Sequence, residues 1–172
     1  MIIWQTIVEF LVRDVAVWGD LKNPMLSCLG SIGLVKFFGW HVTPLNFDFG
    51  QASLTPSADR FLAKVMPAFA VAVCGTPRPL IAGIVIEGHT DDLGGDALNL
   101  RLSQERSLRV LIRGLEVIQA SVPSAYTCFG QLTSASGRGK QDIIYDTEQR
   151  PNRELSRRVI FKILLRPGDT RA

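Results

Sequence analysis

The sequence contains few cysteines, and none of them has the spacing of a metal site. Cys28, Cys74 and Cys128 lie far apart, and there is neither a CxxC pair nor a Cys/His cluster. An oxidising compartment would allow one disulfide and leave one thiol. We favour the simpler interpretation of three buried apolar thiols. A structural zinc ion is not expected.

Long uncharged segments are also missing. Residues 1–18 are apolar but interrupted by charges, and no Lys or Arg precedes them, so a signal peptide is not predicted. Residues 25–40 carry only Lys36 as a charge, but they are shorter than the roughly 20 residues of a spanning helix. Residues 1–40 are therefore interpreted as an N-terminal extension. It is either the remnant of a membrane anchor or a segment that contacts a membrane or membrane protein.

The chain has no strong excess of charge of either sign. Of its 172 residues, 20% are charged and 47% hydrophobic, with a formal net charge of +3, which describes an ordinary globular protein. The mild positive charge suits an anionic partner such as a wall polymer, a nucleic acid or a lipid surface. No tract interleaves basic and aromatic residues, so nucleic acid is not an expected partner.

Motifs of enzymes are absent as well. The sequence has no nucleophile elbow and no glycine loop that would cradle a phosphate. Glu87 and Asp91 would share one strand face without a division into acid and base. The stretch His89-Thr90-Asp91-Asp92 could suit a metal ion, but His89 and Asp91 alternate at a strand end with no third ligand nearby in the sequence. We therefore expect no catalysis, no metal and no cofactor.

What the sequence does contain is a regular alternation of predicted strands and helices. Thr55-Pro56 is typical of a helix start, and the apolar run Leu80–Glu87 of a strand buried on both faces. The predicted order is β-α-β-α-β-(α)-β, an α+β domain at 41–166 with a mixed sheet, helices on one face and a tail at 167–172. The expected strands are Val42–Phe49, Leu80–Glu87, Leu132–Ser136 and Arg158–Leu165; the expected helices are one from Pro56, Ala97–Gln119 and Glu148–Ser156.

The most informative stretch follows the second predicted strand. Asp91 stands just beyond the end of that strand, where loops build binding sites in open α/β sheets. Arg106 lies seven residues after Asn99, about two turns along the same helix face. A carboxylate and a guanidinium held close together suit a zwitterionic amino acid, since one binds its ammonium and the other its carboxylate.

Four collinear motifs resemble the peptidoglycan-binding domain of the OmpA-like family, which is also found in MotB-type motor anchors. They extend over about residues 42–165: Phe47-Asp48-Phe49 with Leu54; Glu87-Gly88-His89-Thr90-Asp91 with Gly94; Asn99, Leu102-Ser103, Arg106 and Val110; and Asp146-Thr147 with Ser156-Arg157-Arg158-Val159.

The resemblance implies a role for each of six residues. Asp91 would receive the ammonium of the diaminopimelate side chain in the peptide stem, and Arg106 would bind its carboxylate. Asn99 would line the pocket. Thr90, Asp48 and Arg158 would border it. Because Arg157 and Arg158 are adjacent on a strand, only one of them should line the pocket, and the resemblance favours Arg158.

The function implied is non-catalytic binding of the peptidoglycan stem peptide, which would anchor an envelope or motor-type complex to the wall. The expected location is the bacterial cell envelope, with the domain facing the periplasm. The main alternative is a structural part of a membrane-associated assembly, for example a homo-oligomer, with the pocket unused. A wall hydrolase is a distant third interpretation.

Overall fold

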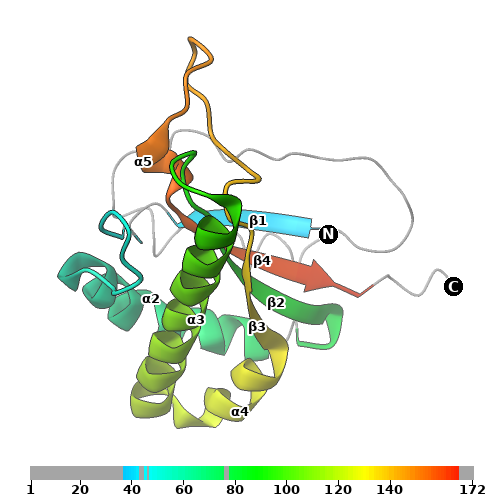
Figure 1. Cartoon of the computed structure of the whole chain (residues 1–172). Helices are drawn as coiled ribbons and strands as arrows, with labels where there is room; N and C mark the ends of the chain where they lie inside the picture. Colours follow the sequence, from blue (N-terminus) through cyan, green and yellow to red (C-terminus); the bar gives the residue numbers. More distant parts are fainter. Residues whose placement is uncertain (1–36, 43–44, 46, 76–77, 167–172) are drawn as a thin grey trace, which may run out of the picture.

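The structure is a computed structural model that describes residues 37–42, 45, 47–75 and 78–166. Strands β1 (Phe37–Val42), β2 (Ile81–Gly88), β3 (Thr133–Gly137) and β4 (Val159–Leu165) form one sheet in the order β1-β4-β2-β3 (Figure 1). β2 and β3 are parallel, whereas β4 runs antiparallel to both β1 and β2. The predicted mixed sheet and α+β class are confirmed.

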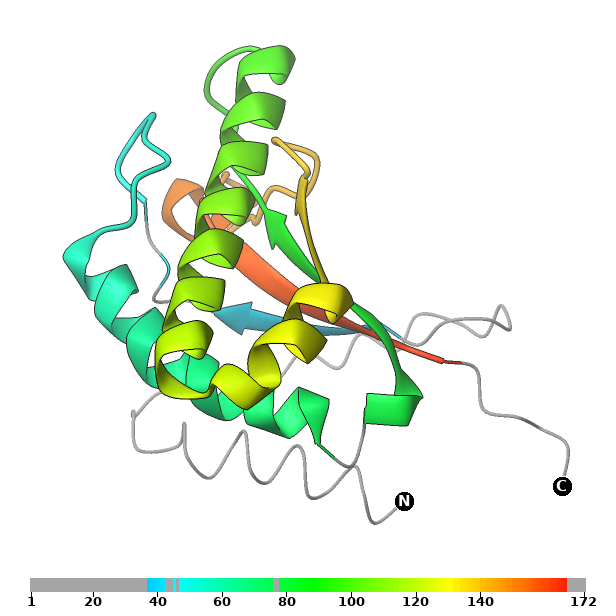
Figure 2. The same cartoon turned by 90° about the horizontal axis from the view of Figure 1, so that it is seen from below.

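Three helices pack on one face of this sheet. They are α2 (Pro56–Cys74), α3 (Asp96–Ser121) and α4 (Pro123–Leu132), and Figure 2 shows all three on the same side of the strands. A 3-10 turn, η1 (Arg78–Leu80), leads into β2, and a single turn, α5 (Arg153–Ser156), precedes β4. No helix within these described ranges is long and apolar enough to cross a membrane.

Strand alternation decides which side chains reach the core. Ile84 and Ile86 of β2, and Val159 and Phe161 of β4, are buried against the helices. Phe69 of α2 packs edge-to-face on Phe161 and on Phe129 of α4, with ring centroids 5.6 and 5.9 Å apart. Residues of the other parity, such as Glu87 and Lys162, lie on the opposite face of the sheet.

The first strand lies earlier in the chain than its pattern predicted. The expectation of a strand at Val42–Phe49 is wrong, because β1 ends at Val42. Leu45 and Phe47 are buried in the core without belonging to a strand. Their alternation therefore reports the burial of an irregular segment rather than pairing in a sheet.

The other element boundaries agree closely with the prediction, with two exceptions. α2 begins after Thr55, whose side chain accepts a hydrogen bond from the Ala58 amide, and continues past Pro67 to Cys74. The first exception is α4, which the sequence analysis did not identify. The second is α5, which is shorter than the expected helix Glu148–Ser156 because residues 145–151 form a turn closed by a bridge between Tyr145 and Pro151.

The structure explains the glycine inside α3. A Cβ at Gly114 would lie 2.9 Å from the Cε atom of Met66, so the missing side chain lets α2 pack close to α3. The helix-propensity cost of about 1 kcal/mol relative to alanine is thus offset by packing.

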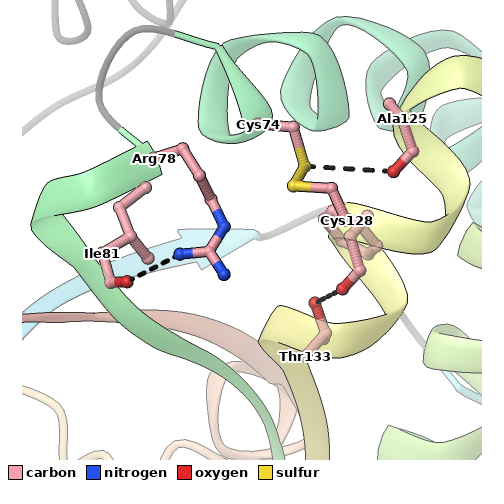
Figure 3. Close-up of a disulfide and its surroundings, with 7 residues drawn as sticks. Cys74, Arg78, Ile81, Ala125, Cys128 and Thr133 are labelled. Carbon is pink, nitrogen blue, oxygen red and sulfur yellow. Dashed lines mark hydrogen bonds between the residues drawn. A yellow bond between two sulfur atoms is a disulfide. The ribbon is translucent and has the colours of Figure 1, made fainter.

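A disulfide joins α2 to α4. Cys74, the last residue of α2, is bonded to Cys128 of α4, as Figure 3 shows. The favoured interpretation of three free thiols is therefore wrong for these two residues. Cys28 lies outside the described residues, as do most of the predicted extension 1–40 and the whole tail 167–172; residues 37–40 belong to β1.

Candidate functional site

The site lies where α3 crosses the ends of β2 and β3. A Cβ at Gly88 would lie 2.2 Å from the Ser103 carbonyl oxygen, and one at Gly137 would lie 2.5 Å from the Gln104 amide nitrogen. Both strands therefore end in glycines because the helix backbone lies directly over them. Ser103 fixes this contact, since its hydroxyl accepts a hydrogen bond from the Gly139 amide at 2.8 Å.

Asp91 is a buried carboxylate just beyond β2, with only 4% of its surface exposed. Its Oδ2 atom is 2.8 Å from Arg157 Nη1, and its Oδ1 atom accepts a hydrogen bond from the Leu93 amide at 3.2 Å. Arg157 is itself about one-quarter exposed. The cation paired with Asp91 is therefore at the border between the protein interior and solvent.

Arg106 is the largest fully buried side chain of the described residues, and it holds the segment before α2. Its Nε atom donates to the Gln51 carbonyl at 2.9 Å, and Nη2 donates to the Asp48 carbonyl at 3.1 Å. The guanidinium carbon lies 5.0 Å from the centroid of the Phe47 ring. Its third nitrogen, Nη1, is buried and has no hydrogen-bond partner among the described residues.

The electrostatics of Arg106 follow from its surroundings. The pKa of Arg106 is lowered to about 10, mainly by burial; the nearby positive charge of Arg157 acts in the same direction, and the negative charge of Asp91 opposes it. The group is still charged at neutral pH. Two guanidinium groups thus act on a single carboxylate, which leaves the pocket with one positive charge in excess.

Asn99 and Thr90 complete the inner part of the site. Asn99 is buried and donates from Nδ2 to the Leu93 carbonyl at 2.7 Å, so it supports the same loop residue that Asp91 binds. The Thr90 amide donates to the Gly139 carbonyl at 2.9 Å, and its buried hydroxyl has no partner among the described residues. The loop backbone is therefore held at Thr90 and Leu93, while the threonine hydroxyl has no partner among the described residues.

The two remaining predicted residues lie differently from expected. Asp48 borders the site through its backbone carbonyl, which Arg106 binds, and its side chain is exposed. Arg158 was predicted to border the pocket, and the structure directs its side chain to partners other than Asp91. Arg157 pairs with Asp91, whereas Arg158 donates to the carbonyls of Asp142 and Ser156. The two side chains diverge because they are neighbours in an extended segment.

Arg158 belongs instead to a second polar cluster beside the sheet. His89 is 1% exposed; its Nε2 atom is 3.2 Å from Glu87 Oε1 and its Nδ1 atom 3.6 Å from Asp142 Oδ2. Burial lowers the pKa of His89 to about 3, and the charge of Arg158 contributes in the same direction. Lys162 forms an ion pair with Glu87, so the carboxylate that a metal ion would need already has a cation.

Further ion pairs hold the loop between β2 and α3 from outside. Arg153 binds both oxygens of Asp92, at 2.8 and 3.2 Å, and Lys140 lies 2.8 Å from Asp96. Both pairs are in contact with solvent, so each contributes little to stability. Asp92, the residue after Asp91, thus faces Arg153.

Sequence reasoning missed Arg157 and Ser103 as parts of the site. A signal for Arg157 was present: it shares the parity of Val159 and Phe161, whose side chains are buried against the helices, and α3 carries Arg106 on that side. Ser103 stands in the third motif, but its role was not predicted, because its partner, the Gly139 amide, belongs to a loop whose course the sequence does not predict.

The four-stranded mixed sheet, the helices on one of its faces and a polar site at the end of β2 define the class of the protein as an α+β domain. The chain belongs to the OmpA family, whose model matches residues 46–157. Among solved structures, the cell wall anchor of the T6SS from Pseudomonas aeruginosa is 19% identical, with a TM-score of 0.51 and coverage of 92% of this chain and 96% of that one. The periplasmic domain of Helicobacter pylori MotB (residues 78–256) is 16% identical, with a TM-score of 0.53 and 83% of each chain covered. A search of curated proteins returned no match.

Proposed function

We propose that this chain binds the peptide stem of peptidoglycan without cleaving it, and so anchors an envelope or motor-type complex to the cell wall. The ligand group would be the amino-acid end of a diaminopimelate side chain. Asp91 would bind its ammonium, and Arg106 would bind its carboxylate. Asn99 would support the loop, and Thr90 and the Asp48 backbone would border the pocket.

The observation that carries this proposal is the unfilled hydrogen-bonding capacity beside Asp91. The Arg106 Nη1 atom and the Thr90 hydroxyl are both buried and have no partner among the described residues. Buried polar atoms without partners are costly and rare in folded proteins. A ligand carboxylate that accepts from Nη1 would remove this cost close to Asp91, whose carboxylate is paired with a cation, Arg157, in the free protein.

Membership of the OmpA family and the shared fold of the cell wall anchor support the same assignment. The disulfide between Cys74 and Cys128 agrees with an oxidising compartment such as the periplasm. Residues 1–40 would then supply the contact to a membrane or to a membrane-protein partner. One small site of this kind binds weakly, so tethering would gain strength from several copies acting on one polymer.

The test is co-sedimentation of the full chain with purified peptidoglycan sacculi. The matched variants are Asp91→Asn and Asp92→Asn, which remove the same charge from adjacent residues. We expect Asp91→Asn to lose at least about tenfold in binding, because it removes the buried carboxylate that would pair with the ligand ammonium. Asp92→Asn should bind like the wild type, since its carboxylate pairs with Arg153 on the surface.

Either of two results would contradict the proposal. The first is a wild-type chain that stays in the supernatant, and the second is an Asp91→Asn variant that sediments as well as Asp92→Asn. Both would favour the alternative of a structural role in a membrane-associated assembly, with the pocket unused. Release of soluble glycan fragments would contradict the non-catalytic part of the proposal.

A further inference from the structure

In the free protein Arg157 is paired with Asp91. A ligand ammonium that binds Asp91 must therefore displace Arg157. The ammonium of any ligand would approach the same Asp91 carboxylate that Arg157 binds at 2.8 Å. Arg106 is not free to exchange with the ligand in this way, because its Nε and Nη2 atoms hold the carbonyls of Gln51 and Asp48. Of the two arginines, Arg157 is the one partly exposed to solvent and free to change partner.

We infer that Arg157 is a specificity-determining residue that makes a ligand carboxylate obligatory through an exchange of ion pairs. The ligand ammonium takes the place of Arg157 at Asp91, and the released guanidinium binds the carboxylate on the same carbon of the ligand, beside Arg106 Nη1. This inference rests on the proposed function. It adds a selection rule that neither Asp91 nor Arg106 provides alone.

The charges in the pocket give the physical reason. Asp91 contributes one negative charge, and Arg106 and Arg157 contribute one positive charge each. An ammonium without a carboxylate would place a third positive charge around a single buried carboxylate and leave Arg157 unpaired. An amino-acid end brings one charge of each sign, so every group in the pocket gains an opposite partner.

The geometry of the surrounding pairs makes Arg157 different from its neighbours. Arg153 also binds a carboxylate of the same loop, but that carboxylate is Asp92, on the surface. Arg158 is directed to the carbonyls of Asp142 and Ser156, away from Asp91. Arg157 is therefore the one arginine of this segment that contacts the buried carboxylate.

The experiment compares two ligands by isothermal titration with the full chain at low salt. meso-Diaminopimelate has an ammonium and a carboxylate on each of its two α-carbons, and cadaverine is the same diamine with both carboxylates removed. The wild type should prefer diaminopimelate by at least about tenfold. In Arg157→Ala the preference should fall to within about threefold, with weaker binding of diaminopimelate and stronger binding of cadaverine.

Two further variants separate exchange from a structural effect. Arg157→Lys retains the positive charge, so it should retain the preference and also rescue folding if Arg157→Ala is unstable. Arg153→Ala removes a similar ion pair from the same loop and should leave the preference unchanged. Stronger binding of cadaverine is the decisive readout, because general damage to the pocket would weaken both ligands.

The outcomes distinguish this inference from the proposed function. If the wild type binds diaminopimelate and Arg157→Ala retains the full preference over cadaverine, the exchange is refuted and the proposed pocket stands. The same conclusion follows if Arg157→Lys loses the preference completely while remaining folded. If the wild type binds neither diaminopimelate nor sacculi, the proposed function fails and the inference fails with it.

Discussion

Replacing Gly88 by alanine tests the contact that brings α3 to the pocket. The added Cβ would lie 2.2 Å from the Ser103 carbonyl oxygen and 3.0 Å from its carbonyl carbon. These are backbone atoms in the middle of a helix, so no side-chain rotation relieves the overlap. Gly88 has an ordinary negative-φ conformation, so the conflict is one of space rather than of backbone strain.

The magnitude follows from two opposing effects. Overpacking of a well-packed contact costs about 1–3 kcal/mol, and alanine returns about 0.4–1 kcal/mol by restricting the unfolded chain. We therefore expect Gly88→Ala to lower the free energy of unfolding by about 1–2 kcal/mol, measured by urea denaturation. The matched control is Gly130→Ala in α4, where the nearest atom to the new Cβ is Leu115 Cδ2 at 3.8 Å. That variant should be more stable than the wild type by up to about 1 kcal/mol.

The same substitution should also weaken binding of sacculi. Asn99 and Arg106 are carried by α3, whereas Asp91 follows β2, so a displaced helix separates the two halves of the site. The reasoning is refuted if Gly88→Ala unfolds at the same urea concentration as the wild type. It is refuted equally if Gly130→Ala loses as much stability as Gly88→Ala.

Three other predictions concern stability. Replacing Cys74 and Cys128 together by alanine should cost about 4 kcal/mol in urea denaturation, because the disulfide closes a loop with a sequence separation of 54 residues; equal stability of the wild type with and without reductant would contradict this. The pKa of His89 is lowered to about 3, so between pH 6.5 and pH 3 only the unfolded state binds a proton at this residue. The free energy of unfolding should therefore fall by about 1.4 kcal/mol for each unit by which the pH is lowered across this range, and His89→Asn should remove this contribution. Thr55→Ala should cost about 1 kcal/mol in thermal denaturation through the lost N-cap, whereas an unchanged midpoint would show that the cap contributes nothing.

Most of the fold was predictable because its core elements carry clear periodic patterns. β2, α3 and β4 differ from their predicted boundaries by one or two residues. The missed helix α4 also had a pattern, since Ala125, Phe129 and Leu132 are buried at helical spacing. Its ten residues lack a side-chain N-cap, and the signal at its start is Pro123 alone.

The error in the first strand has a different cause. Leu45 and Phe47 alternate with polar residues, which is typical of a strand, but they are buried in an irregular segment. Phe47 lies against the Arg106 guanidinium, and the carbonyls of Asp48 and Gln51 accept hydrogen bonds from the same group. An arginine far away in the sequence thus donates to backbone carbonyls that a neighbouring strand would bind in a sheet. The local sequence does not reveal such a partner.

The choice between Arg157 and Arg158 was open to reasoning from parity alone. Val159 and Phe161 alternate along the last strand and are buried in the core, so Arg157 should lie on the same side as α3 and its Arg106. The resemblance to a family motif pointed to Arg158 instead. The ion pair between Arg157 and Asp91 agrees with local alternation, because alternation follows from the geometry of an extended chain.

The structure also changes how loss of binding should be interpreted. Arg106 and Asn99 both support backbone groups, Arg106 at the segment before α2 and Asn99 at the loop after β2. A variant of either residue would disturb the shape of the pocket as well as its chemistry, so a loss of binding would not show direct contact with the ligand. Asp91 is more informative, because Asp92 offers an identical charge one residue away in a different environment. A difference between these two aspartates would therefore report on the buried carboxylate itself.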